Sequence, residues 1–155
     1  MTTATVTQTT RPIEFDVAGI PKPQGSKRAF NRPGAKQPTM VESAGAALKD
    51  WRAAVKYAAA KQCRQIRGAV KVELAFRFPR PKSHFGTGRN ADTMKGSAPV
   101  HHTKKPDLDK LERAVLDALT QVVIEDDSCV VVLSASKLYS SRVEFPGCHI
   151  RVEAA

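Results

Sequence analysis

Cysteines and long apolar runs are scarce in this sequence, and each shortage excludes a class of protein. The three cysteines, Cys63, Cys129 and Cys148, are an odd number without paired short spacing. They therefore indicate free or buried thiols in a reducing compartment, not a disulfide framework. No apolar run is long enough to span a bilayer, and the first twelve residues lack a charged region followed by an apolar stretch. We therefore expect a cytoplasmic protein.

Acidic residues are also few. The chain has 15 Asp and Glu against 25 Lys and Arg, which gives a formal net charge of +10 and a pI near 9.9. This charge favours a partner rich in phosphate, such as a nucleic acid. A membrane partner is not expected, because no basic amphipathic helix with a bulky apolar face is present. The 155 residues suffice for one domain with a buried core.

The amino-terminal part combines a polar tail, a short strand and a basic segment. Residues 1–12 are rich in threonine and predict a disordered tail, so that the single domain covers 13–155. Apolar residues over 13–20 alternate for the most part and predict a first strand. The segment PKPQGSKR follows, and residues 28–30 can pair with 39–41 as a short irregular hairpin. The segment predicts either an arm that contacts phosphate or a solvated loop, and its cations are Lys22, Lys27 and Arg28.

Two further elements show a clear periodicity. Ser43 is the expected N-cap of a helix over 44–62, and Trp51 lies on the apolar face of that helix, so we expect its side chain in the core. Apolar and mostly charged residues alternate over 70–78. This alternation predicts a strand with one buried face and one solvated or functional face.

A long basic loop follows over 80–105, rich in glycine, serine, lysine and arginine. A loop of this length in a compact domain is usually functional or disordered. One interpretation is that it orders against a phosphate backbone, and the other is an insertion without a role. The cations expected to contact DNA from this loop are Arg80, Lys82, Lys104 and Lys105.

The segment 106–129, PDLDKLERAVLDALTQVVIEDDSC, concentrates carboxylates on this cationic chain. Its apolar residues recur with helical spacing on one face. Asp107 and Asp109 stand at the start of the predicted helix, and Asp126 and Asp127 follow just beyond its end. We expect the chain to return there beside the first pair.

Two interpretations of these acids remain open. In the structural one, Asp107 caps the helix, Asp109 favours its dipole, and the later pair forms a turn before a strand. In the functional one, the acids bind a hard divalent cation such as Mg²⁺, for which two or three carboxylates plus phosphate oxygens suffice. Arg113, one turn after Asp109, or a loop lysine then stabilises the charge of a phosphoryl transition state.

The stretches KKPDLDKLERAVLDAL and IEDDSCVV together resemble the signature of the RusA family of Holliday-junction resolvases, found in bacteria and many phages and prophages. PKPQGSKR also resembles the family's amino-terminal segment. The resemblance is strong over 104–133 and loose elsewhere. It implies metal-binding acids at Asp107, Asp109 and Asp127, with Asp126 as a neighbouring ligand.

The resemblance also implies a homodimer that makes paired, symmetric nicks across a four-way DNA junction, in the cytoplasm of a bacterial or phage-infected cell. The implied cofactor is Mg²⁺, for which Mn²⁺ can substitute. Two positions depart from the family pattern. Lys110, which we expect at the DNA, stands where Asn is usual. Arg113 stands where the helix usually carries a catalytic Lys, and a guanidinium cannot replace a compact ammonium in every role.

After the acids, residues 130–139 predict a strand that returns through a hairpin into 149–152. The order of elements predicts an α+β or α/β domain, a RusA-like small mixed sheet with two main helices. The expected function is a structure-selective endonuclease that resolves Holliday junctions in recombination, repair or phage DNA processing. The alternatives are a junction-binding protein without catalysis and a basic structural protein whose acids only cap and turn.

Overall fold

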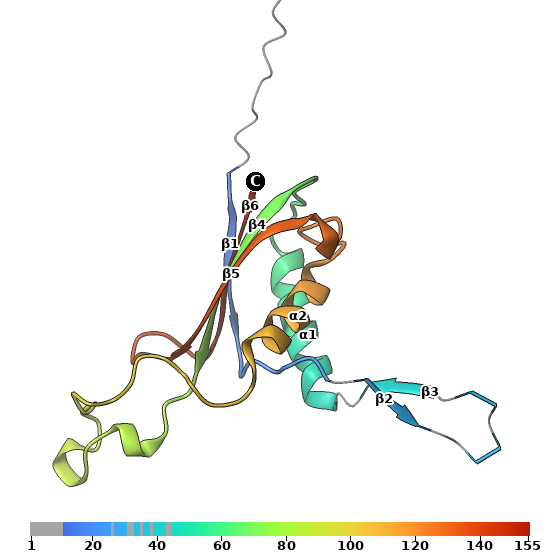
Figure 1. Ribbon diagram of the computed structural model, residues 1–155. Helices are drawn as coiled ribbons and strands as arrows, with labels where there is room; N and C mark the ends of the chain where they lie inside the picture. Colours follow the sequence, from blue (N-terminus) through green and yellow to red (C-terminus); the bar gives the residue numbers. More distant parts are fainter. Residues whose placement is uncertain (1–10, 26, 31–32, 35, 38, 43–44) are drawn as a thin grey trace, which may run out of the picture.

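The computed structural model describes residues 11–25, 27–30, 33, 34, 36, 37, 39–42 and 45–155. Its centre is a mixed four-stranded sheet (Figure 1). The strand order is β1 (Ile13–Ala18), β6 (Gly147–Ala154), β4 (Val70–Phe78) and β5 (Val130–Tyr139). β6 is antiparallel to both of its neighbours, whereas β4 and β5 are parallel. The prediction of a small mixed sheet in an α+β domain is confirmed.

Two helices, α1 (Ala46–Ala60) and α2 (Leu108–Leu119), pack on the same side of this sheet (Figure 1). Trp51 of α1 is only 4% exposed, as predicted for a core residue. An ion pair of 3.6 Å between Arg52 and Asp117 joins the two helices nearer the surface. Leu111 and Val115 of α2 are fully buried in the same hydrophobic core.

Side chains alternate between the two faces of the sheet along each strand. One face packs against the helices and forms the core, and the other, which we call the open face, points away from them. On β4 the apolar side chains of Val72, Leu74 and Phe76 are buried, and the intervening positions face away from the helices. The open face carries a network of charges. Arg77 donates to Asp16, and the His149 ring nitrogens lie 3.0 Å from Glu14 and 3.3 Å from Asp16. On this open face, the charged side chains of neighbouring strands therefore pair largely with one another.

Several element boundaries differ from those predicted. The first strand ends at Ala18 because Gly19 takes a φ of +134°, and Ile20 is 51% exposed. The first helix begins at Ala46 with Gly45 as N-cap, whereas Ser43 lies outside the described residues. The predicted hairpin is present as β2 (Lys27–Phe30) and β3 (Thr39–Glu42), which pair antiparallel. The predicted tail lies outside the described residues up to position 10.

The predicted hairpin between the last two strands is wrong. β6 does not return beside β5 but crosses β4 and inserts between β4 and β1. Gly147, which lies in the predicted hairpin connection, begins β6 at a point of close approach to β1. A Cβ atom at this position would lie 1.9 Å from the carbonyl oxygen of Val17. The glycine therefore allows β6 to enter the middle of the sheet.

β5 consequently forms one edge of the sheet. Val131, Val132 and Leu133 in its first half are 59%, 49% and 37% exposed. The basic loop over 80–105 contains two 3₁₀ turns, η1 (Lys82–His84) and η2 (Gly88–Asn90). Within the described residues, no helix is long and apolar enough to cross a membrane. All three cysteines are free, as predicted, and burial raises the pKa of the Cys148 thiol.

Candidate active site at the amino-terminal end of α2

Asp107 and Asp109 are both exposed at the amino-terminal end of α2. Asp107 occupies the N-cap position with extended backbone angles, φ −72° and ψ 143°, but its side chain makes no capping hydrogen bond. Its Oδ2 instead lies 3.7 Å from Nζ of Lys110. The structural interpretation of Asp107 as a capping side chain is therefore not supported, and its carboxylate remains accessible from solvent.

Lys137 of β5 fixes the backbone immediately before these acids. Its Nζ donates hydrogen bonds of 2.7 Å to the carbonyl oxygens of Lys104 and Pro106. Lys137 pairs with Phe76 in the sheet, and therefore faces the helices. Sequence reasoning missed this residue. The available signal was a lysine at a core-facing position of an otherwise regular strand.

The basic segment near the amino terminus also reaches this end of α2. The backbone amide of Gln24 donates a 2.9 Å hydrogen bond to the carbonyl oxygen of Lys110, and Pro21 is fully buried. This contact brings the segment that carries Lys22 beside the first turns of the helix. PKPQGSKR and the acidic segment, far apart in the sequence, are therefore neighbours in space.

The cations predicted to contact DNA fall into three groups. Lys104 and Lys105 are exposed directly before Asp107, where Lys22 and Lys110 also lie nearby. Lys82 is exposed in η1, whereas Arg80 is tied into the fold through hydrogen bonds of 3.0 and 2.8 Å to the carbonyls of Ser140 and Pro99. The last group consists of Lys27 and Arg28 in β2, whose side chains lie outside the described part of the structure.

The second acidic pair, Asp126 and Asp127, follows the carboxyl-terminal end of α2. Asp126 precedes the 3₁₀ turn η3 (Asp127–Cys129) and accepts a 2.9 Å hydrogen bond from the amide of Ser128. Hydrogen bonds from the Ser128 side chain and amide hold the pKa of Asp126 below its usual range. Asp126 therefore has the turn role that the structural interpretation gave it, whereas Asp127 is exposed without a role in capping.

The expected return of the chain beside the first acids does not occur within one chain. α2 has 12 residues, which at about 1.5 Å per residue separates its ends by roughly 18 Å. β5 gives a similar distance, because Lys137 beside the first acids and Val130 beside the second are about 23 Å apart at 3.3 Å per residue. No group of three potential metal ligands gathers among the residues that the structure describes.

Glu112 adds a third carboxylate near Asp109 that the sequence reasoning overlooked. Partial burial, followed by the negative charge of Asp109, raises the pKa of Glu112. The signal in the sequence was the spacing of three residues, which places both side chains on one side of the helix. Acidic charge therefore accumulates at the start of α2 in spite of the surrounding lysines.

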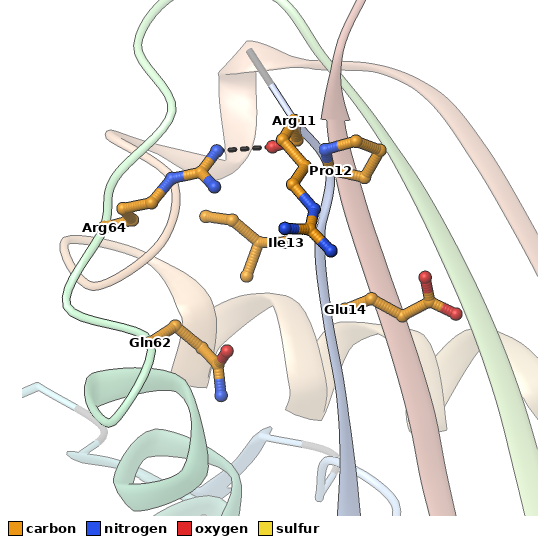
Figure 2. Close-up of a pocket in the computed structure, with 6 residues that line it drawn as sticks. All are labelled: Arg11, Pro12, Ile13, Glu14, Gln62 and Arg64. Carbon is orange, nitrogen blue, oxygen red and sulfur yellow. Dashed lines mark hydrogen bonds between the residues drawn. The ribbon is translucent and has the colours of Figure 1, made fainter.

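A separate pocket lies at the opposite end of the sheet, between the start of β1 and the end of α1 (Figure 2). Its volume is about 310 Å³. Arg64 closes one side by donating to the carbonyl oxygen of Arg11, and Glu14 is the one acid among the lining residues (Figure 2). This pocket does not include any of the predicted site residues.

Comparison with known proteins identifies the family of this chain. The family model described as "Endodeoxyribonuclease RusA" matches residues 19–153. The chain belongs to the RusA family. This is a family of endodeoxyribonucleases that resolve Holliday junctions, so the predicted resemblance is confirmed. An uncharacterised protein, YqaN of Bacillus subtilis (strain 168), is 34% identical over 137 residues, which cover 85% of this chain and 92% of that protein.

The two departures from the RusA pattern both lie at the start of α2. Lys110, in place of the usual Asn, is paired with Asp107 and so brings a positive charge to the first acid. Arg113, in place of the usual Lys, is exposed one turn after Asp109. Both positions carry a cation near the predicted acids, and neither departure removes one of the predicted carboxylates.

Proposed function

We propose that this chain is a Mg²⁺-dependent, structure-selective endonuclease that resolves four-way DNA junctions by paired symmetric nicks, in recombination, repair or phage DNA processing. The observation that carries the proposal is the presentation of Asp107 and Asp109. Their carboxylates are exposed at the end of a rigid helix, Asp107 makes no capping bond, and basic segments flank both. Carboxylates of this kind are needed where a cation must meet a phosphate backbone.

The donor set at this end of α2 fits Mg²⁺. A hard cation of this size uses one or two carboxylates, several waters and substrate phosphate oxygens, and Asp107 and Asp109 supply the carboxylates. When bound, Mg²⁺ or Mn²⁺ supplies an activated water and charge stabilisation for phosphodiester hydrolysis. Lys104 and Lys105 attract the phosphate backbone, and Arg113 places a positive charge where the cleaved phosphate develops negative charge.

A homodimer explains how Asp127 and its neighbour Asp126 can contribute to the same centre. Within one chain these acids lie about 18 Å from Asp107, at the far end of a 12-residue helix. A second copy can bring its own Asp127 to this centre. The exposed apolar edge of β5 directly follows η3 and offers a surface for such a contact. Two coordinated nicks in one junction also require two centres.

The first test is cleavage of a labelled synthetic four-way junction in Mg²⁺ or EDTA, with a linear duplex as control. We expect the wild type to make symmetric nicks in the junction only, and in Mg²⁺ only. Asp109→Asn should abolish the nicks and retain or strengthen junction binding, because it removes a metal ligand and also a charge that repels phosphate. Cleavage by this variant at the wild-type rate would remove Asp109 from the centre.

A mixing experiment tests whether the acids come from two copies. Asp109→Asn and Asp127→Asn chains, each inactive alone, are unfolded together, refolded as mixed dimers and assayed on the junction. If each centre combines Asp109 of one copy with Asp127 of the other, the mixed dimer keeps one intact centre. It should then nick one strand without making the paired second nick. If both acids act within one copy, the mixed dimer should make no nick.

The departures at Lys110 and Arg113 favour a second candidate, a junction-binding protein that has lost catalysis. Lys110 neutralises part of the Asp107 charge across 3.7 Å, which weakens cation binding. Junction-selective binding without nicks in Mg²⁺ or Mn²⁺ would support this candidate. Absence of selective binding would instead indicate a basic structural protein.

A further inference from the structure

An apolar pocket of about 480 Å³ lies beyond the carboxyl ends of β4 and β5. These two strands are parallel, and open sheets commonly bind ligands outside the carboxyl ends of parallel strands. The pocket volume falls within the range of roughly 300–1,000 Å³ that is typical of small-ligand sites. Three chain segments line it, with the residues Pro79, Arg80, Phe85, Met94, Ser140, Ser141, Arg142 and Val143.

Backbone hydrogen bonds hold the walls of this pocket together. Phe85 and Met94 face each other across an antiparallel bridge within the basic loop. Flanking bonds of 2.9 Å join Gly86 to Thr93 and Lys95 to His84. Arg80 ties the loop to the end of β5, through the bonds to Ser140 and Pro99 described above. The pocket is therefore a built feature of the loop.

The chemistry of the walls specifies the ligand. Pro79, Phe85, Met94 and Val143 provide apolar surface suited to the face of a ring. Arg80 and Arg142 are the two charged residues of the lining, and both are positive. An apolar wall with arginines beside it matches a ligand that joins a flat ring to an anion. A nucleotide has this combination, because its base stacks and its phosphate is charged.

The pocket lies near the same end of β5 as Asp107. Lys137 binds the carbonyl oxygen of Pro106, which directly precedes Asp107. Ser140 lines the pocket three positions further along the chain from Lys137. Lys137 and Ser140 are therefore about 10 Å apart along the chain at 3.3 Å per residue. This length is on the order of three nucleotides at ~3.4 Å each along one DNA strand.

We propose that this pocket, which we call the base pocket, receives an unstacked nucleobase of the branched DNA, from a nucleotide within a few positions of the cleaved phosphate. The inference rests on the proposed junction-binding function. Its new content is that the basic loop over 80–105 helps to bind an unstacked base. Removing a base from the stack costs least where pairing is already interrupted, as at a branch point. Occupancy of the base pocket therefore favours a junction over a continuous duplex.

The test places 2-aminopurine, a base whose fluorescence rises on unstacking, at successive positions around the branch of a synthetic junction. All proteins carry Asp109→Asn to prevent cleavage. When the protein with no further substitution binds, we expect the 2-aminopurine fluorescence to rise at one or two of these positions. Val143→Trp, at a side chain that is 93% exposed, should fill the base pocket without disturbing the core and abolish the rise. Val100→Trp, at a 61% exposed valine outside the pocket, is the matched control and should keep it.

Binding measurements complete the test. Val143→Trp should weaken junction binding roughly tenfold, the order expected for loss of one stacked base. An abasic nucleotide at the responsive position should cause the same loss in the unchanged chain and no further loss in Val143→Trp. Junction-selective binding without any fluorescence rise, or with a rise that survives Val143→Trp, would overturn the base pocket alone. Absence of junction-selective binding would overturn both the base pocket and the proposed function.

Discussion

Lys137 provides the sharpest prediction about the positioning of the candidate site. In Lys137→Met the two 2.7 Å hydrogen bonds to the carbonyls of Lys104 and Pro106 are lost, while the length of the side chain is nearly kept. A hydrogen bond with a charged partner contributes about 1.5–3 kcal/mol. One of the two carbonyls is exposed and regains water, so we expect the free energy of unfolding to fall by about 2–3 kcal/mol.

The larger effect should be on catalysis. Without the Lys137 side chain, residues 104–106 lose their two hydrogen bonds to β5, although main-chain bonds still join residues 100–102 to that strand. A shift of about 1 Å in a catalytic group can cost on the order of 100-fold in rate. We therefore expect a loss of this size in single-turnover nicking of a four-way junction, measured well below the unfolding midpoint in urea. Junction binding should change little.

Lys71→Met is the matched control. This lysine lies on β4 and faces away from the helices, so its replacement should leave the nicking rate unchanged. If Lys137→Met loses stability but nicks the junction at the wild-type rate, Lys137 supports the fold without positioning Asp107. If both variants slow nicking equally, the loss of a positive charge explains the effect, and Lys137 does not position Asp107.

Three further predictions concern the core, the open face of the sheet and the helix. Leu111→Ala, at a fully buried position of α2, should lower the free energy of unfolding in urea by about 3 kcal/mol. Partial burial tends to raise the pKa of Asp16, but hydrogen bonds from Arg77 and His149 outweigh the burial and hold this pKa below its ordinary value. The ionised Asp16 therefore stabilises the fold above about pH 4, and this stabilisation is lost as the pH falls through the pKa of the folded state. Asp16→Asn should therefore flatten the acid limb of the unfolding free energy below pH 4, and an unchanged limb would contradict the assignment. Arg113→Lys should raise the single-turnover nicking rate, because an ammonium acts as a compact charge, and a slower variant would show that the guanidinium is required.

The sequence predicted best those elements whose burial is periodic. The alternation over 70–78 matches β4 residue for residue, and the apolar spacing after Asp107 matches the start of α2. These patterns arise because one face of each element must leave water. They contain no information on which strands become neighbours. The misplacement of β6 follows from this, since Pro146 and Gly147 indicate a turn equally well whether the chain returns beside β5 or passes across β4.

The sequence could suggest residues for the candidate site but not their geometry. Asp107 and Asp109 could be proposed because they stand two positions apart at a helix start. The position of Asp127 depends on the path between α2 and β5, which no local pattern specifies. Lys137 and the base pocket escaped prediction for the same reason, because each depends on contacts between segments that only the folded sheet brings together.

The place of β6 in the sheet has a consequence for the order in which the chain folds during synthesis. β1 is made first among the sheet strands, and its partner in the sheet is β6, which is made last. Until β6 leaves the ribosome, β1 and the neighbouring side of β4 present unpaired backbone groups. Pairing between such distant segments is slow, and exposed strand edges favour aggregation during the delay. Truncation within β6 should therefore divide the sheet and not merely shorten it.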